Sequence, residues 1–204
     1  TLFQTCALPI TFEAGYGSSS RVYERAAGAL GMTPANYARD GLGQQIRYGI
    51  AACSLGLVLV AATERGLCRV ELGDSDTAMV RHLRQEFAAA AIERDDDALE
   101  AFLKEILRRL EGRAPHRDLP LDIRATAFQR QVWEELRRIP RGETRSYAEI
   151  AAAIGRPAAM RAVGNACANN PVAIAIPCHR VLRNDGKLGG YAWGSERKQA
   201  LIAA

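Results

Sequence analysis

Short apolar runs separated by polar turns occupy the chain between about residues 44 and 73. The runs cover residues 47–53, 57–62 and 67–72, and a glycine lies in each gap between them. Apolar runs of this length, bounded by turn-forming residues, are typical of strands. The pattern therefore predicts a small antiparallel β-sheet.

Two segments with apolar residues at helical spacing come after the predicted sheet in the sequence. Residues 77–91 and 98–110 each carry apolar residues on one helical face, as at Leu99, Phe102, Leu103, Ile106, Leu107 and Leu110. The three aspartates between them, residues 95–97, are interpreted as a solvated loop and helix cap and not as a metal site. No catalytic set of residues is evident in this part, which we expect to be scaffold.

The sequence of the third part of the chain, residues 119–204, predicts three more helices. Thr126 caps an amphipathic segment, a second helix begins at Ser146 and ends at Gly155, and a third covers residues 157–168. Two short helices joined at a glycine form a helix-turn-helix. The fold class is thus α+β, with a sheet and helices over residues 44–118 and a mostly helical domain over residues 119–204.

Composition and charge narrow the class of protein. Hydrophobic residues make up 48% of the 204 residues, and no run of apolar residues is long enough for a membrane helix. Residues 1–111 carry 12 Lys and Arg against 15 Asp and Glu, whereas residues 112–204 carry 15 against 8. A basic C-terminal part favours contact with a phosphate backbone, although a solvated surface explains it equally well.

The five cysteines are scattered, odd in number and without a C-x-x-C pair. This spacing argues against a disulfide framework and against a zinc site. We therefore expect the protein to be located in the cytoplasm, which is reducing. The start of the chain has neither an initiator methionine nor a charged leader, and it is interpreted as an internal fragment.

The most informative segment is residues 176–180, with the sequence Ile-Pro-Cys-His-Arg. A cysteine is a nucleophile as its thiolate, which a neighbouring base or cation promotes, and His179 and Arg180 supply one of each. Adjacent side chains diverge, so contact between Cys178 and His179 needs a turn or a bridging water. The alternative is a buried structural cysteine beside a hydrogen-bonded histidine.

The surroundings of Cys178 resemble the active-site block of the O6-alkylguanine-DNA alkyltransferases. Asn169-Asn170-Pro171 precedes the apolar run, and Gly190-Tyr191 follows the Pro-Cys-His-Arg-Val core. The resemblance runs from about Ile46 to the end of the chain. It implies that Cys178 takes an alkyl group irreversibly from O6-methylguanine, and also from O4-methylthymine, in double-stranded DNA.

The resemblance also assigns roles to individual residues. His179 takes the proton of Cys178 through a water, and Asn170 braces the active-site turn. Arg161 fills the gap left by the flipped nucleotide, and Tyr147 helps to rotate that nucleotide and protonates guanine N3. Further residues implied at the DNA surface are Ala162, Asn165 and Ser146, and those implied at the substrate pocket are Tyr191, Val181, Arg180 and Lys198. No cofactor and no metal are expected, and the protein is expected to be a monomer without a membrane partner.

One family residue has no counterpart within the sequence. The glutamate that orients the histidine in the family falls one position beyond Ala204, and Glu196 lies about two helical turns away from that place. We therefore expect the chain to be cut just short of a functional residue, and Cys167 is interpreted as structural.

Residues 1–43 carry a different resemblance. A serine run before Arg21, then Gly31, Thr33 and Pro34, resemble the last part of an AraC-type DNA-binding domain, which implies a helical remnant of that domain. A helical hairpin that merely packs on the rest is the alternative. The combination is similar to bacterial adaptive-response regulators, with promoter DNA and RNA polymerase as further partners of the parent protein. The zinc-binding cysteines of those regulators are not in this sequence.

Three further functions remain open from the sequence. The alkyl acceptor could serve mainly as a sensor for transcription, the chain could bind lesions without repairing them, or the Cys-His pair could belong to a hydrolase. Cys178 argues against the second function, because lesion-binding relatives lack the cysteine. Multiple turnovers would distinguish the hydrolase from a single-use acceptor.

Overall fold

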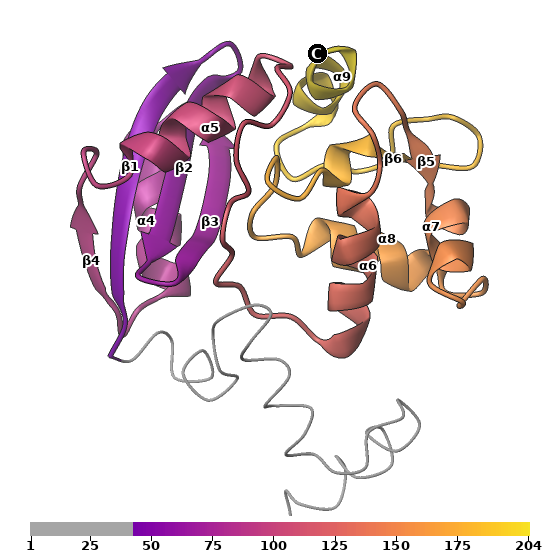
Figure 1. Ribbon diagram of the computed structural model, residues 1–204, viewed down its shortest axis with the longest axis horizontal. Helices are drawn as coiled ribbons and strands as arrows, with labels where there is room; N and C mark the ends of the chain where they lie inside the picture. The colour runs from indigo at the N-terminus through magenta and orange to yellow at the C-terminus, as the bar shows by residue number, and fades with distance from the viewer. Residues whose placement is uncertain (1–42) are drawn as a thin grey trace, which may run out of the picture.

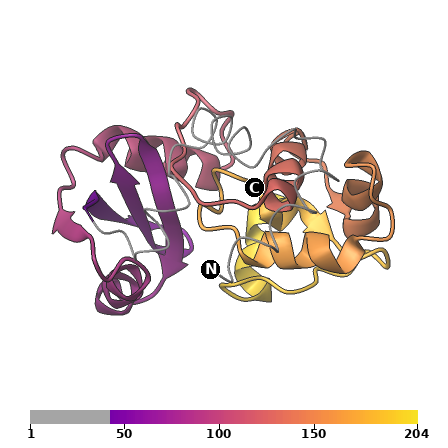
Figure 2. The ribbon, with the colours of Figure 1, turned by 90° about the horizontal axis from the view of Figure 1, so that it is seen from below.

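The computed structural model describes residues 43–204, which form two lobes (Figure 1). A sheet with two helices forms the N-terminal lobe, and a group of short helices forms the C-terminal lobe (Figures 1 and 2). The expected AraC-like segment lies, except for its last residue, outside the described residues.

The sheet of the N-terminal lobe has the order β3-β2-β1-β4. Its strands are β1 (Gln45–Cys53), β2 (Gly56–Thr63), β3 (Gly66–Gly73) and β4 (Ala91–Arg94). The first three are antiparallel, as the glycine-separated runs predict, but β4 pairs in parallel with β1. The sheet is therefore mixed at one edge and not wholly antiparallel.

The helix predicted over residues 77–91 is shorter in the structure, and strand β4 begins at the last of those residues. Helix α4 (Asp76–Glu86) begins at its Ser75 cap and ends five residues earlier than predicted. Phe87 is buried against the sheet, and the backbone N–H of Ala91 donates to Gln44 O at 3.0 Å. Tertiary pairing with β1 thus overrides the helix propensity of the alanines that follow Phe87.

Helices α4 and α5 (Glu100–Leu110) cover opposite faces of the sheet (Figure 1). Leu103 and Ile106 of α5 share a core with Val58 and Val60 of β2, whereas Leu83 of α4 packs with the other face. The core beneath α5 continues into the C-terminal lobe. One hydrophobic core therefore joins the two lobes.

The aspartate loop before α5 has a structural role. Asp95 accepts a hydrogen bond from Ala98 N at 2.9 Å, and Asp96 accepts one from Ile50 N of β1 at 3.1 Å. Within residues 43–204 there is no group of three or more His, Cys, Asp or Glu side chains arranged to hold a metal ion.

The C-terminal lobe contains four α-helices and a two-stranded parallel sheet. The elements are α6 (Ala127–Arg137), β5 (Arg145–Ser146), α7 (Tyr147–Ala153), α8 (Met160–Ala168), the 3₁₀ turn η1 (Cys178–Arg180), β6 (Val181–Leu182) and α9 (Ser195–Ala203). The predicted cap at Thr126 is confirmed, because Thr126 and Gln129 form a reciprocal capping box.

Helices α7 and α8 form the predicted helix-turn-helix. Gly155 ends α7 with φ of 72°, a left-handed conformation that glycine adopts without strain. Helix α8 begins at Met160, three residues later than predicted. Residues 156–159 form a separate turn, closed by a hydrogen bond from Ala159 N to Arg156 O at 2.9 Å.

Loops of the C-terminal lobe cover the free edge of β3. Leu67 N donates to Pro120 O at 2.8 Å, and Val70 N donates to Pro171 O at 2.9 Å. These bonds satisfy an edge strand that would otherwise be open to pairing. They also fix the loop that leads to Cys178 against a rigid sheet, which is the scaffold role predicted for the N-terminal lobe.

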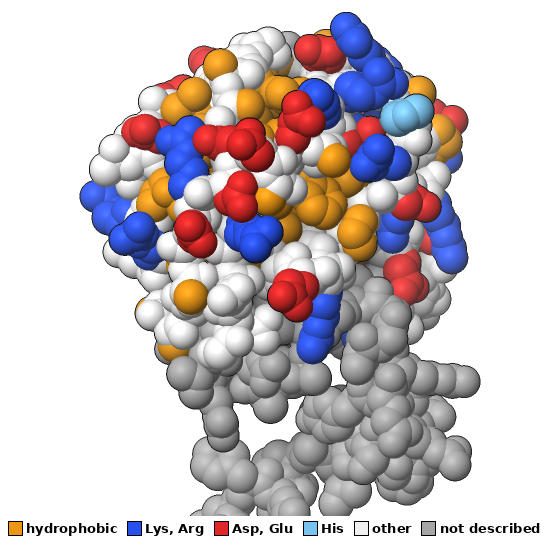
Figure 3. All heavy atoms as spheres, turned by 60° about the vertical axis from the view of Figure 1, so that its left-hand side comes forward, with side chains coloured by type: hydrophobic (Ala, Val, Ile, Leu, Met, Phe, Trp, Pro, Cys, Tyr) orange, Lys and Arg blue, Asp and Glu red, His pale blue; other side chains and the backbone are white. Residues whose placement is uncertain are grey.

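The side of the molecule that carries β4 has acidic and basic side chains interspersed (Figure 3). No helix among residues 43–204 has the length and apolar character needed to span a bilayer.

Candidate active site

A braced turn delivers the cysteine to its position. The Asn170 amide donates to Ile176 O at 2.9 Å, and its carbonyl oxygen accepts from Val172 N at 3.1 Å. Both bonds are buried, and together they close the loop over residues 170–176. Ile174 in this loop has φ of 74°, a conformation that is uncommon for a β-branched residue and that the surrounding bonds hold in place.

Cys178 and His179 occupy the single 3₁₀ turn η1 that follows this loop. Strand β6 comes directly afterwards and pairs in parallel with β5, so that Ser146 lies opposite Leu182. Tyr147 begins α7 at the end of β5. The pairing of two very short strands therefore brings Tyr147 close to Cys178.

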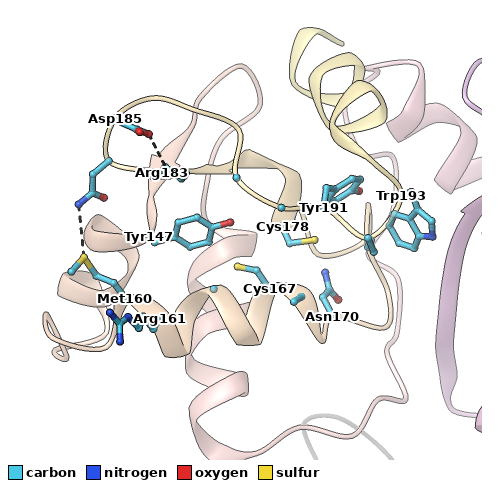
Figure 4. Close-up of a pocket in the computed structure, with 17 residues that line it drawn as sticks. Tyr147, Met160, Arg161, Cys167, Asn170, Cys178, Arg183, Asp185, Tyr191 and Trp193 are labelled. Atoms are coloured by element: carbon cyan, nitrogen blue, oxygen red, sulfur yellow. Dashed lines mark hydrogen bonds and ion pairs between the residues drawn. The ribbon is translucent and has the colours of Figure 1, made fainter.

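A cavity of about 820 Å³ opens in front of Cys178 (Figure 4). Helix α8 forms one wall of the cavity, and the loop over residues 183–193 forms another. Tyr191 and Trp193 meet edge to face at 5.3 Å between ring centroids, at the opposite end of the cavity from Met160 and Arg161 (Figure 4). A mostly apolar cavity of this size, lined by two thiols and two tyrosines, suits a flat aromatic ligand.

The thiol of Cys178 is 5% exposed, and burial raises its pKa above the usual value. Several groups oppose this effect. A hydrogen bond from the Asn170 side chain, the charge of Lys198, and the backbone N–H groups of Cys178 and His179 all lower the pKa. For Cys167, which lines the same cavity, burial raises the pKa to about 12, and Lys198 is the only opposing cause. Cys178 thus has more groups around it that favour the thiolate than Cys167 has.

Lys198 is a buried cation close to this thiol. It is 1% exposed, and its ammonium group donates to Val181 O at 2.7 Å and to Leu188 O. Both acceptors are neutral carbonyls, so the positive charge is not cancelled by a bonded carboxylate. The positive charge of Lys198 favours the thiolate of Cys178. The two hydrogen bonds hold β6 and the loop after it, and so help to shape the cavity.

His179 faces a different environment from Cys178. Its side chain lines a second cavity of about 180 Å³, which Arg141, Leu201 and Ala204 also line. The Nδ1 atom is buried and has no hydrogen-bond partner among the described residues. Burial first, and then the charges of Arg180 and Lys198, lower the pKa of His179 to about 3. The imidazole is therefore neutral, and the same causes make it a weak base in this environment.

Helix α8 presents a surface next to the cavity. Trp133 of α6 donates to Ala166 O at 2.9 Å and anchors the buried side of α8. Arg161 is exposed at the rim of the cavity, and the predicted residues Ala162 and Asn165 are exposed on the same helix. Small residues along α8 leave its outer face open to a close approach by a partner.

The residues predicted from sequence are placed in three settings. Cys178, Asn170, Tyr147, Tyr191 and Arg161 all line the main cavity. Three residues predicted for the pocket do not line it: Val181 is fully buried, Lys198 lies behind β6, and Arg180 donates to Ile139 O at 3.0 Å and faces the second cavity. Ser146 caps α7, because its hydroxyl accepts from Glu149 N at 3.2 Å.

Sequence reasoning missed several residues of the cavity wall. Met160 and Trp193 line it although no role was predicted for them, and Cys167 lies in the wall although it was interpreted as structural. Met160, Arg161, Gly164, Cys167 and Ala168 follow helical spacing, so the face of α8 that carries Arg161 could have indicated most of them.

Comparisons with known proteins agree with this geometry. Residues 46–123 match the model of the 6-O-methylguanine DNA methyltransferase ribonuclease-like domain, and residues 127–204 match the model of the DNA-binding domain of the same family. The methylated-DNA–protein-cysteine methyltransferase of Methanosarcina barkeri is 42% identical over 159 residues, which are 76% of this chain and 94% of that protein. The chain belongs to the 6-O-methylguanine DNA methyltransferase family.

Two further relatives extend the comparison. The crystal structure of Mycobacterium tuberculosis OGT in complex with DNA superposes with a TM-score of 0.65 at 36% identity, covering 77% of this chain and 91% of that one. The bifunctional transcriptional activator/DNA repair enzyme Ada of Escherichia coli is 48% identical over 189 residues, which are 93% of this chain and 53% of that protein. The chain thus spans about half the length of the Ada proteins that it matches.

Proposed function

We propose that this protein repairs DNA by transferring the alkyl group of O6-methylguanine, and of O4-methylthymine, irreversibly to Cys178. The main support for the proposal is the placement of the Cys178 thiol in a cavity large enough for a purine, beside an exposed helix-turn-helix surface. The names of the relatives support the same reaction. A thiol nucleophile needs a reducing compartment, so we place the reaction in the cytoplasm.

The chemical step is a displacement at the alkyl carbon. The Cys178 sulfur forms a bond to that carbon while the bond from carbon to guanine O6 breaks. His179 takes the thiol proton through a water, because the two side chains line different cavities and the transfer cannot be direct. Tyr147 lies in the cavity with Cys178, where its hydroxyl can protonate guanine N3 as the base is released from the alkyl group.

Access to the lesion requires base flipping, because O6 is enclosed within the duplex. Arg161 is exposed at the rim of the cavity and is not engaged in any ion pair found for residues 43–204. Its side chain is free to enter the stack in place of the flipped nucleotide. Asn165 and Ala162 lie on the same exposed surface and would contact the phosphate backbone.

The imidazole of His179 needs an acceptor for its Nδ1–H in order to act as an oriented base. His179 lines its cavity together with Leu201, Ile202 and Ala204. A carboxylate placed in this cavity would orient the imidazole and raise its pKa.

A role in transcription is a second candidate function for the parent protein. The named activity of the Escherichia coli relative, which matches over 93% of this chain, favours it. Promoter DNA and RNA polymerase would be the further partners. Residues 1–43 would belong to the AraC-type module that contacts them.

The proposal is tested by stoichiometry. The protein is titrated with a duplex that carries a radiolabelled methyl group on guanine O6, and label transferred to protein is counted. A plateau near one label per protein molecule, and none for Cys178→Ala, supports the proposal. Continued product formation beyond one equivalent would identify a turnover enzyme and overturn it.

A further inference from the structure

Met160 is an exposed apolar side chain at the rim of the cavity. Met160 is 42% exposed, and it is the only large hydrophobic residue among residues 43–204 that is exposed. Other large apolar side chains in this part of the molecule are at least partly covered. A single exposed methionine needs no explanation by itself, so its surroundings decide its meaning.

The surroundings of Met160 point to the DNA surface. Met160 is the first residue of α8, directly before Arg161, and both lie at the same end of the cavity (Figure 4). The Asn184 amide donates to the Met160 sulfur at 3.8 Å, which ties α8 to the loop on the other side of the cavity mouth. Met160 is thus held at the entrance through which a nucleotide must pass.

The chemistry of a methionine suits this place. Removing a nucleotide from a duplex exposes the apolar faces of the two flanking base pairs. Methionine is among the side chains that proteins insert between base steps, and its polarizable thioether packs well against aromatic faces. Arg161 brings a planar, charged guanidinium group to the same gap, and Met160 adds an apolar side chain beside it.

We propose that Met160 is a positioning residue that packs against the base pair flanking the flipped nucleotide and, with Arg161, holds the lesion outside the helix. The occupant of this surface is therefore a DNA base pair and not a second protein. The proposal rests on the proposed function, since it concerns the same reaction in duplex DNA. It assigns Met160 no part in the transfer of the alkyl group itself.

The test compares duplex with single-stranded substrate. Met160→Ala is expected to slow transfer from an O6-methylguanine duplex about tenfold, equivalent to about 1.4 kcal/mol, and to leave transfer from a single-stranded oligonucleotide unchanged. Met160→Leu, which keeps an apolar side chain of similar volume, is expected to restore the duplex rate. Gln199→Ala, a truncation on the exposed face of α9, is the matched control.

A second readout separates positioning from folding. A 2-aminopurine placed beside the lesion becomes fluorescent when it loses its stacking partner, and Met160→Ala is expected to reduce that signal at saturating protein. Thermal unfolding of the variant should match the wild type, because Met160 is exposed. An equal loss of rate on duplex and single strand, or no loss on the duplex, would overturn the proposal. Wild-type transfer to the single strand reports on the proposed function independently.

Discussion

Cys178 and His179 are neighbours in one 3₁₀ turn, yet their side chains line different cavities. Cys178 faces the 820 Å³ cavity next to α8, and His179 faces the 180 Å³ cavity next to the end of α9. The pair is therefore not a direct nucleophile–base contact. The fold separates the proposed alkyl acceptor from the proposed proton acceptor, and each has its own set of neighbours.

The buried neutral state of His179 makes stability depend on pH. Its pKa is about 3 in the folded protein and about 6.5 when unfolded, so the unfolded chain binds the proton in between. Stability should be complete above about pH 6.5 and fall on acidification by up to about 1.4 kcal/mol per pH unit. Urea unfolding between pH 7 and pH 4 measures the slope.

Two variants test whether His179 causes this dependence of stability on pH. His179→Gln should flatten the dependence on pH, whereas His116→Gln should keep it, because His116 is exposed. A wild-type slope retained in His179→Gln would attribute the effect to the carboxylates instead.

The charge of Lys198 should set the pH at which Cys178 reacts. Lys198→Gln keeps a donor for the backbone carbonyls and removes the cation, so the pKa of Cys178 should rise further. We expect single-turnover transfer at neutral pH to slow about tenfold, with the rise in rate displaced to higher pH. Lys198→Arg, which retains the charge, should keep the wild-type pH profile. A uniform loss of rate at every pH in Lys198→Gln would indicate that Lys198 acts only through loop geometry.

Asn170 should matter for both stability and reactivity. Asn170→Ala removes two buried hydrogen bonds and leaves Val172 N without this partner, at a cost of about 1–3 kcal/mol for the unsatisfied group, whereas Ile176 O still accepts from Cys178 N at 2.8 Å. Transfer should slow as well, because the turn carries Cys178. Denaturant unfolding and single-turnover rates measure the two effects. Asn169→Ala, at the exposed neighbouring position, should change both by much less, and equal effects from the two variants would remove Asn170 from its role.

Arg161 should be needed only when the lesion lies within a helix. Arg161→Ala is expected to reduce transfer from duplex DNA by at least about tenfold and to leave the reaction with free O6-methylguanine unchanged, because the free base needs no flipping. Arg156→Ala serves as the control, since Arg156 is also exposed on the helix-turn-helix and lies over the Phe128 ring at 5.8 Å. A matching loss with the free base would place Arg161 in the chemical step.

The sequence predicted the residues that line the site more completely than the long-range contacts around the site. Cys178 and Asn170 come together as the motifs indicate, because the short Asn-Pro turn determines their positions, whereas the pairing of β5 with β6 brings Tyr147 to them. Strand β4 was missed because its pairing with β1 is a long-range contact that alanine-rich residues do not signal. The family resemblance implied Lys198 at the pocket, but the ammonium group is bonded to the backbone carbonyls of Val181 and Leu188, and a sequence pattern does not reveal such long-range partners.

The most direct test of the account is a peptide mass map of the protein after reaction with an O6-methylguanine duplex. Cleavage after Arg161 and Arg180 releases one peptide that contains both Cys167 and Cys178, and fragmentation of that peptide distinguishes the two thiols. We predict one added methyl group, located on Cys178 and absent from Cys178→Ala. A methyl group on Cys167, or an unmodified peptide after the lesion has lost its methyl group, would contradict it.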